Sequence, residues 1–324
     1  MSDVMTRKSL IAAAILALGA AAGTAGAAEG QRHFPGVGAA MDAIVAAAAA
    51  GDTAALAAIL GPEGEELYSS GDPIADRKAL EEFAEAARAR TVVEYETPDR
   101  VSFSIGEDEW PAPTPLVKDA AGWRFDAAEG KEEIVNRRIG RNELYAIGVM
   151  RALVEAQEEY AAADPMRAGV RQYAQRILST KGQRDGLYWP TEPNGDLSPL
   201  GETVAAAVKD GYGDVDTSKL VPYHGYFFRL LNAQGKQAPG GPKSYVADGK
   251  MTGGFAVLAW PADYGSAGIK SFVVNQQGIV YEKDLGADTG KAALALKEYD
   301  PDDSWEPVEE TEIESPEPEV VSNP

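Results

Sequence analysis

This chain of 324 residues contains two histidines, His33 and His224, and no cysteine. Acid–base chemistry by an imidazole side chain could therefore use only these two residues. His224 lies between Tyr223 and Gly225, at the expected start of a strand. An acid or base role requires a carboxylate or hydroxyl partner within hydrogen-bond distance. The alternative is a structural histidine whose ring is satisfied by neighbouring backbone. We expect His33 to lie in a flexible arm.

Aromatic residues beside glycine and proline form a second group with binding chemistry. Their flat apolar faces and polar tips suit recognition of a peptide or a sugar, and they suit core packing equally well. The candidate ligand- or partner-binding residues, all in loops or at strands, are Arg184, Asp185, Tyr188, Trp189, Tyr223, His224, Tyr226 and Trp260. We expect the loop around Tyr188–Trp189 and a nearby strand edge to form the binding surface, with core packing as the alternative.

Acidic pairs and an arginine cluster complete the candidates. Glu107–Glu109, ahead of Trp110–Pro111, can gather carboxylates in a hairpin loop, either as plain surface or as a cation or glycosidase site. Arg137, Arg138 and Arg141 could bind an anion or pair with nearby carboxylates. Cysteine, a phosphate loop and a Gly-x-Ser-x-Gly elbow are all missing from the sequence, so we predict no catalytic residue, metal or cofactor.

The first residues have the pattern of a secretory signal peptide. Arg7 and Lys8 precede a charge-free run, Ser9–Ala28, that contains the small-residue triplet Ala25–Ala27. We predict that residues 1–27 are removed and that the product is periplasmic or secreted, with no stable membrane insertion. An uncleaved anchor is the alternative, since about 20 apolar residues can span a bilayer.

Charge is unevenly distributed along the chain. The formal net charge is −21, and residues 300–324 hold three Asp and seven Glu with no Lys or Arg. Such a segment, rich also in proline, favours disorder, so we expect an acidic disordered tail over 300–324, except around Trp305. Because an acidic surface repels phosphate groups, nucleic acid is not an expected partner.

The expected elements describe an α+β protein. Helical spacing and turn residues predict helices at Gly36–Ala50, Ala54–Leu60 and Ile74–Ala89. Alternating β-branched and aromatic residues then predict strands at Val92–Tyr95, Val101–Ile105, Pro115–Val117 and Gly122–Phe125. Residues 34–126 are therefore expected to form a first domain, with helices packed on an antiparallel sheet.

A second domain is expected over residues 129–299. Glu129–Asp164 is helical in pattern, and Gly140 with a capping Asn142 suggests two helices rather than one. A short helix and an antiparallel meander follow, with expected ranges Leu200–Asp210, Gly225–Leu231, Gly253–Trp260, Ile269–Asn275 and Gly278–Lys283.

Each domain resembles a known class. Ala49–Asp52, Leu56, Leu60 and the pair ending in Gly122–Asp126 resemble the cone-shaped nuclear transport factor 2-like domains, whose members often hold a ligand or an active site inside the cone. That resemblance would place Tyr95, Phe103, Trp110 and Trp123 around a cavity. Gly268–Asn275 and Gly278–Tyr281 resemble the end of type IV pilin and pseudopilin globular domains. Because the long helix is internal here, pilus assembly is not implied.

Five phrases extend the resemblance to the whole mature chain, up to about residue 308. They are Ser69–Pro73, Asn136–Leu144, Arg184–Pro190, Tyr223–Tyr226, and Gly254–Ala256 with Ala259–Pro261. On these phrases the chain resembles the bacterial secreted family known as domain of unknown function 2950. Many members carry an acidic turn after the position of Asp164, but here Pro165–Gly169 replaces it, and a single carboxylate is too few for calcium.

The sequence favours a non-enzymatic function. We expect an envelope-associated interaction or structural module whose partner is an unknown envelope protein or a small ligand. The alternative is small-ligand binding or hydrolysis in the first domain. An open cavity with convergent polar groups would favour that alternative, whereas a filled interior with an apolar surface outside would favour the first reading.

Overall fold

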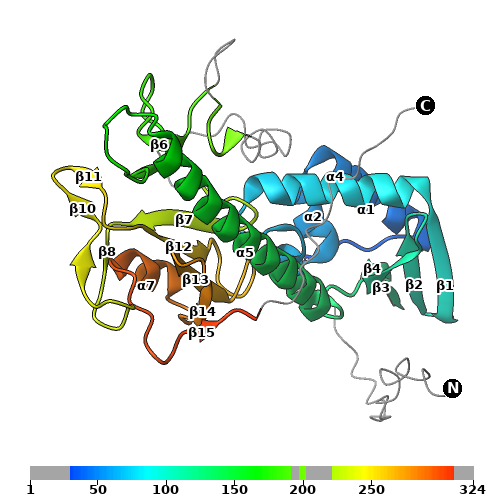
Figure 1. The fold of residues 1–324 in the computed structure, drawn as a ribbon. Helices are drawn as coiled ribbons and strands as arrows, with labels where there is room; N and C mark the ends of the chain where they lie inside the picture. The colour runs from blue at the N-terminus through cyan, green and yellow to red at the C-terminus, as the bar shows by residue number, and fades with distance from the viewer. Residues whose placement is uncertain (1–29, 191–196, 202–220, 310–324) are drawn as a thin grey trace, which may run out of the picture.

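The computed structural model describes residues 30–190, 197–201 and 221–309. It is a mixed α+β structure, as predicted, with helices and a sheet first, then a long helix and a second sheet (Figure 1). The signal segment 1–27 and most of the helix predicted at Leu200–Asp210 lie outside the described residues. No helix among the described residues has the length and apolar character that crossing a membrane requires.

The first part packs helices on a four-stranded sheet. The helices are α1 (Val37–Ala50), α2 (Thr53–Leu60), the 3-10 turn η1 (Pro62–Gly64), α3 (Glu65–Tyr68) and α4 (Pro73–Ala89). The strands, antiparallel and adjacent in chain order, are β1 (Thr91–Thr97), β2 (Arg100–Ile105), β3 (Trp110–Asp119) and β4 (Gly122–Phe125). η1 and α3 occupy what was expected to be loop, and β3 is longer than predicted.

Local capping residues explain the helix ends. Gly51 ends α1 in the left-handed conformation, with φ +61°, and its N–H returns to the carbonyls of Ala47 and Ala48. The Asp52 carboxylate accepts from the N–H of Ala55 at 2.9 Å and starts α2. Asp72 does the same for α4, which has Pro73 at its first position.

A single helix, α5 (Lys131–Ala163), joins the two parts, so the expectation of two helices is wrong. Asn142 does not cap a helix. It is buried in the middle of α5, and its Nδ2 donates to the carbonyl of Ala267 at 2.9 Å. Gly140 does not interrupt the helix, and a Cβ at this position would meet open space, so packing does not require glycine there. At 1.5 Å per residue the 33 residues of α5 extend for about 50 Å.

The second part is built on a five-stranded sheet. The small strands, in pairs, are β5 (Arg176–Leu178) and β6 (Gly186–Tyr188), β8 (Ala233–Gln234) and β9 (Lys243–Ser244), and β10 (Val246–Ala247) and β11 (Lys250–Met251). The main strands are β7 (Tyr226–Leu231), β12 (Ala256–Pro261), β13 (Lys270–Asn275), β14 (Tyr281–Asp284) and β15 (Glu306–Pro307), with the helix α7 (Thr289–Ala295) before β15. The sheet order is β15-β14-β13-β12-β7, and all pairs are antiparallel.

Two separate hydrophobic clusters lie in the two parts. The first is made by residues between Phe34 and Ala127, and the second by residues between Ala146 and Trp305. Every residue of β12 is buried, which places this strand at the centre of the second core.

At the described chain ends, the exception expected around Trp305 is confirmed and extends over residues 300–309, and the expectation of a flexible arm at His33 is wrong. Residues 300–309 are ordered: β15 pairs with β14, and the Trp305 side chain is buried. Trp305 and Val308 pack on the second core while the acidic side chains around them stay exposed, so the charge density did not prevent docking. His33 is not in a loose arm either, because its Nε2 lies 3.1 Å from Oδ2 of Asp119 and its neighbour Phe34 pairs with Trp123. Residues 310–324 lie outside the described part.

Candidate functional site

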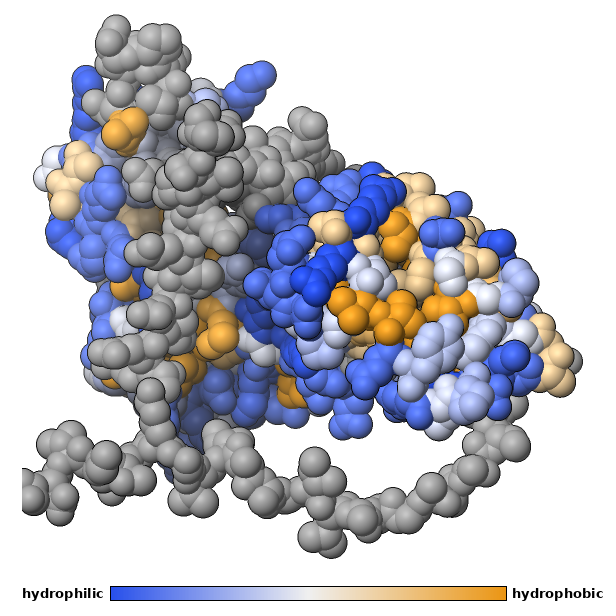
Figure 2. All heavy atoms as spheres, turned by 90° about the vertical axis from the view of Figure 1, so that its right-hand side faces the viewer, coloured by the Kyte–Doolittle hydropathy of each residue, from blue (hydrophilic) through white to orange (hydrophobic). Residues whose placement is uncertain are grey.

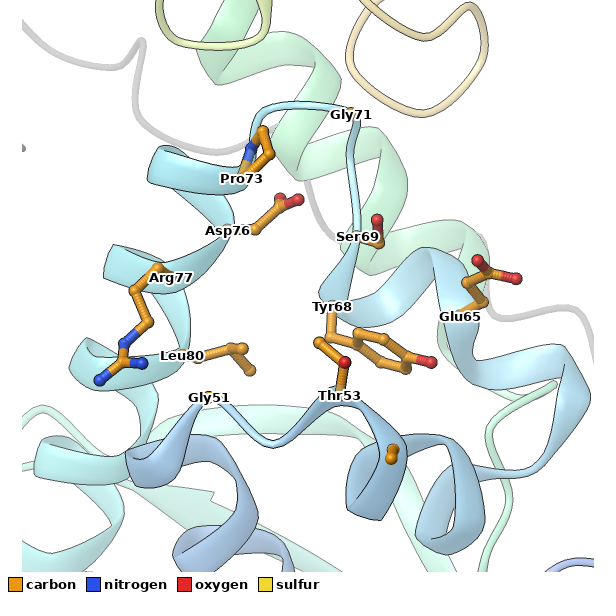
Figure 3. A pocket seen from close by; sticks show the side chains of 11 residues that line it. Gly51, Thr53, Glu65, Tyr68, Ser69, Gly71, Pro73, Asp76, Arg77 and Leu80 are labelled. Atoms are coloured by element: carbon orange, nitrogen blue, oxygen red, sulfur yellow. The ribbon is translucent and has the colours of Figure 1, made fainter. Parts of the chain in front are cut away.

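A pocket of about 530 Å³ opens where α2, α3 and α4 meet (Figure 3). Its lining residues are Gly51, Thr53, Ala54, Glu65, Tyr68, Ser69, Gly71, Pro73, Asp76, Arg77 and Leu80. The pocket exists because α2 and α4 both begin beside it, each after an aspartate cap. Asp76, Arg77 and Leu80 come from α4, and Tyr68 and Ser69 lie across from them.

Asp76 is the main polar group of the pocket. Its Oδ1 accepts from the Ser70 hydroxyl at 2.6 Å and its Oδ2 from the Ser70 N–H at 2.9 Å. Burial raises the pKa of the Asp76 carboxyl, while the Ser70 hydrogen bonds and the charge of Arg138 oppose that shift. Ser70 is buried and its hydroxyl already donates to Asp76, so this serine braces the loop before α4, while the half-buried Asp76 carboxylate still lines the pocket.

The other charged groups of the pocket are on its rim. Arg77 donates through Nε to Glu81 at 2.6 Å and through Nη1 to the carbonyl of Ala50 at 3.3 Å. Burial first, and the charge of Glu65 second, raise the pKa of the Tyr68 hydroxyl. The pocket thus offers hydroxyls, carboxylates and one paired cation, without a histidine, which suits reversible binding of a small polar molecule better than nucleophilic chemistry.

Next to this pocket, the chain leading into α4 joins the first part to the second. Asp72 is buried, and its Oδ2 accepts from the N–H of Gly225 at 2.9 Å while its Oδ1 caps α4. The Ser266 hydroxyl donates to the carbonyl of Ser69 at 3.3 Å. Gly71 approaches so closely that a Cβ there would lie 3.1 Å from Cβ of Asp263. The junction is therefore a polar contact between segments about 150–200 residues apart.

Helix α5 completes this junction from the other side. Arg138 donates through Nε to the Ser266 carbonyl at 2.9 Å and through Nη2 to its hydroxyl at 2.8 Å. Burial lowers the pKa of Arg138 and the charge of Asp76 opposes the shift. Glu143 accepts from the N–H groups of Ile269 and Lys270 at 3.0 and 2.9 Å, in the chain that leads into β13. Of the predicted arginine cluster, Arg138 therefore holds the junction together, and Arg137 pairs with Glu133.

The predicted binding residues do not meet at one site. Trp189 packs edge-on against Tyr160, with ring centroids 6.5 Å apart, and the Arg184 guanidinium lies 5.4 Å from the Trp189 ring centre. His224 instead stacks on Tyr145 at 4.5 Å. Tyr145 and Tyr160 are separated by 15 residues of α5, or about 22 Å of helix. Folding of the Arg184–Trp189 loop over His224 is therefore not observed.

His224 has a structural explanation of its own. Tyr223 and Tyr226 exchange two backbone hydrogen bonds, and the two residues between them have positive φ, +48° at His224 and +77° at Gly225. That combination defines a tight two-residue turn of the primed type, which favours Gly, Asn and Asp. A Cβ at Gly225 would lie 2.7 Å from Nδ2 of Asn142, so this position requires glycine for space as well.

Several of the other predicted residues lie in the second core. Tyr226 and Trp260 are buried and Tyr188 is half-buried, while Asp185 binds the N–H and hydroxyl of Thr180. The Tyr226 hydroxyl donates to the Lys270 carbonyl at 2.9 Å. Trp189 is also buried. The alternative of core packing therefore describes Trp189, Tyr226 and Trp260, and Tyr188 is half-buried beside them.

The four residues expected to line a cavity in the first part do not converge on one space among the described residues. Phe103 and Trp123 are buried in the first core, and Phe103 meets Phe125 edge-on at 6.2 Å. Tyr95 and Trp110 are exposed, and Trp110 lies under the Arg137 guanidinium at 5.1 Å. Glu109, in the acidic turn before Trp110, pairs with Arg90. Within the described ranges no three carboxylates or histidines are grouped for a metal ion.

The comparisons with known proteins give one match. A family model described as protein of unknown function (DUF2950) matches residues 31–308. The chain belongs to the DUF2950 family. No curated protein and no solved structure matches it, so the finer resemblances to nuclear transport factor 2-like and pilin-like domains gain no support.

In this DUF2950 protein, three of the sequence segments on which the family resemblance rests contain the junction residues that the sequence analysis did not identify as functional. Ser69–Pro73, Asn136–Leu144 and Tyr223–Tyr226 are far apart in sequence but supply Asp72, Arg138, Asn142, Glu143 and Gly225 to the junction. Asp72 was recognisable only as a turn residue before proline. Its long-range bond to Gly225 carries no local sequence signal.

Proposed function

We propose that this DUF2950 protein is exported and acts without catalysing a reaction, as an interaction or structural module of the cell envelope. The observation that carries the proposal is the burial of apolar side chains between the helices and the sheet of the first part. Val101, Phe103, Leu116 and Phe125 are buried between the helices and the sheet, where a ligand or active site would otherwise lie. Export rests on the signal pattern of residues 1–27.

The proposed interaction surface is the exposed strand β1. Val92, Val93 and Tyr95 are its exposed apolar and aromatic residues. They replace the Tyr188–Trp189 loop, whose tryptophan is buried. Apolar side chains on a strand at the edge of a sheet are a common basis for protein association.

The experiment combines localisation with an activity screen. Mass analysis of the mature N-terminus should give a protein beginning at residue 28, in the periplasm or medium. Wild type should then turn over none of a panel of esters, glycosides, phosphomonoesters and muropeptides. Turnover that His224→Gln abolishes, in a variant that stays folded, would contradict the non-enzymatic proposal.

A second candidate function is supported by the pocket at α2, α3 and α4. Its volume of about 530 Å³ lies in the range of small-molecule sites. The half-buried Asp76 and the rim residues Arg77 and Glu65 would select a small polar ligand. A thermal-shift screen tests it: a ligand of this site should stabilise wild type and Glu82→Gln, which is outside the pocket, and should lose its effect with Leu80→Arg.

We also propose that residues 34–126 and 129–299 are separate domains, the first nuclear transport factor 2-like and the second pilin-like. The separate hydrophobic clusters and the order of helices and strands support this division. An experimental structure that superposes on members of the two classes would support the two resemblances. A lack of similarity would leave the chain in the DUF2950 family alone.

A further inference from the structure

Strand β1 is the outermost strand of the first sheet. Among the described strands it pairs only with β2, and every one of its residues after Thr91 is exposed. In Figure 1 it lies at the extreme right, and Figure 2 views that side, where apolar (orange) side chains form a band among polar ones. Val92 and Val93 are 39% and 40% exposed, and Tyr95 is 63% exposed. A seven-residue edge of β-branched and aromatic residues is a template for another strand.

The hydrogen bonds to β2 show which backbone groups face outwards. The Gly106 N–H donates to the Arg90 carbonyl at 3.0 Å, and the pairing of Val92 with Ser104 keeps the same register. In an antiparallel ladder the bonded positions alternate, so Val92 and Glu94 bond to β2, and the register shifts between Tyr95 and Thr97. Thr91, Val93 and Tyr95 therefore direct their N–H and C=O groups towards the free edge.

The charges on β1 select both a partner and a register. In an antiparallel pair of β1 strands from two copies, a twofold axis at Glu94 would set Glu94 opposite itself, and an axis at Tyr95 would set Glu94 opposite Glu96. Like charges directly opposite are unfavourable. An axis at Val92 or at Val93 instead sets Arg90, whose backbone is extended, opposite a glutamate, which is Glu94 for the first axis and Glu96, at the register shift between Tyr95 and Thr97, for the second. The axis at Val93 pairs more of the outward-facing positions, because it sets Val93 opposite Val93 and Thr91 opposite Tyr95.

We propose that two copies of this chain join through β1, antiparallel about a twofold axis at Val93, so that their first sheets become continuous. This proposal rests on the interaction function proposed above and names its partner. Arg90 and Glu96 now form exposed pairs with Glu109 and Arg100, and such pairs exchange partners at little cost. A net charge of −21 on each copy opposes association at a distance, so the dimer should strengthen as salt is added.

The test is the oligomeric state of the mature chain by sedimentation velocity over a range of concentrations. Wild type should form a dimer. Val93→Pro removes an N–H from the free edge and none from the bonds to β2, so it should weaken the dimer by about tenfold or more while the thermal midpoint stays close to that of wild type. Val93→Thr keeps the N–H and is the matched control, with an expected dissociation constant close to that of wild type.

Charge exchange tests the register. Glu96→Arg sets arginine opposite arginine at two symmetry-related places and should weaken the dimer by about tenfold. Adding Arg90→Glu should restore most of the affinity, because opposite charges face each other again. A failure of the double variant to recover, with wild type dimeric, would overturn the register that the proposal states.

The experimental outcomes distinguish a failure of the β1 dimer from a failure of the proposed non-enzymatic function. A wild-type protein that stays monomeric at every soluble concentration, or a dimer unaffected by Val93→Pro, overturns self-association through β1. Turnover of a substrate by a dimeric wild type would instead overturn the non-enzymatic function and leave the β1 contact standing.

Discussion

Asp72 and Gly225 are 153 positions apart in sequence, and a buried hydrogen bond of 2.9 Å joins the carboxylate of the first to the N–H of the second. The same carboxylate caps α4, so one side chain both starts a helix and ties the first part of the molecule to the second. The tight turn at His224 and the pocket at Asp76 both lie next to this contact.

Replacing Asp72 should therefore cost more than the loss of an ordinary helix cap. Asp72→Ala removes the cap and leaves the buried Gly225 N–H without this acceptor, which together should lower the free energy of unfolding by about 2–4 kcal/mol. Asp52→Ala, which removes the exposed cap of α2, is the matched control and should cost about 1 kcal/mol. Urea unfolding measures both. Equal losses would mean that the bond to Gly225 contributes nothing.

Gly225 should be intolerant of even one methyl group. Gly225→Ala places a Cβ 2.7 Å from the Asn142 amide at a residue with φ +77°, so we expect a loss of about 2 kcal/mol or more. Gly278→Ala has almost the same φ, +80°, with open space around it, and should lose only about 1 kcal/mol. The difference between the thermal midpoints of the two variants measures the cost of the close contact between Gly225 and Asn142. Equal midpoints would show that the junction rearranges to accept the methyl group.

The fold was predictable where its causes are local. The alternation of Val101, Phe103 and Ile105 gives β2 a buried face, and Asp and Gly residues mark the helix ends. The continuity of α5 was not predictable, because Asn142 has the residue type of a cap while its actual partner is the Ala267 carbonyl. The candidate pocket and the junction depend in the same way on contacts between distant segments.

The pH dependence of stability should reveal the buried carboxyl of Asp76. Burial raises its pKa above the usual 3.8 in the folded protein. A raised carboxyl pKa contributes stability that is fully present below pH 3.8 and is lost as the pH rises through the folded-state pKa. The free energy of unfolding of wild type minus that of Asp76→Asn should therefore fall as the pH rises above 3.8. A difference that rises over this range would contradict the burial of the charged form.

His224 should behave as a turn residue. Asn accepts positive φ readily, so His224→Asn should lower the free energy of unfolding by no more than about 1 kcal/mol, mainly through the lost stacking on Tyr145. His224→Ala loses the stacking and also strains the turn, so it should cost more, about 1–2 kcal/mol. Calorimetry on the two variants gives the order. An alanine variant as stable as the asparagine variant would show that the turn geometry does not set the choice of residue.

The last residues that the structure describes should be required for stability although several of them are acidic. Truncation after Ser304 removes the buried Trp305 and strand β15, and we expect the free energy of unfolding to fall by about 3 kcal/mol or more. Truncation after Glu309 keeps every described contact, including the bond from the Val308 N–H to the Val280 carbonyl, and is the control. Thermal midpoints that agree for the two truncations would contradict the docking of Trp305.

The central claim is that this protein acts by association through its exposed β1 edge, and photo-crosslinking in the living cell tests it most directly. A benzophenone side chain at Tyr95 is compared with one at Leu294, an exposed residue of α7. The account predicts discrete crosslinked products from position 95, with a second copy of the chain as the main partner, and few from position 294. Equal yields from both positions, or none from position 95, would contradict it.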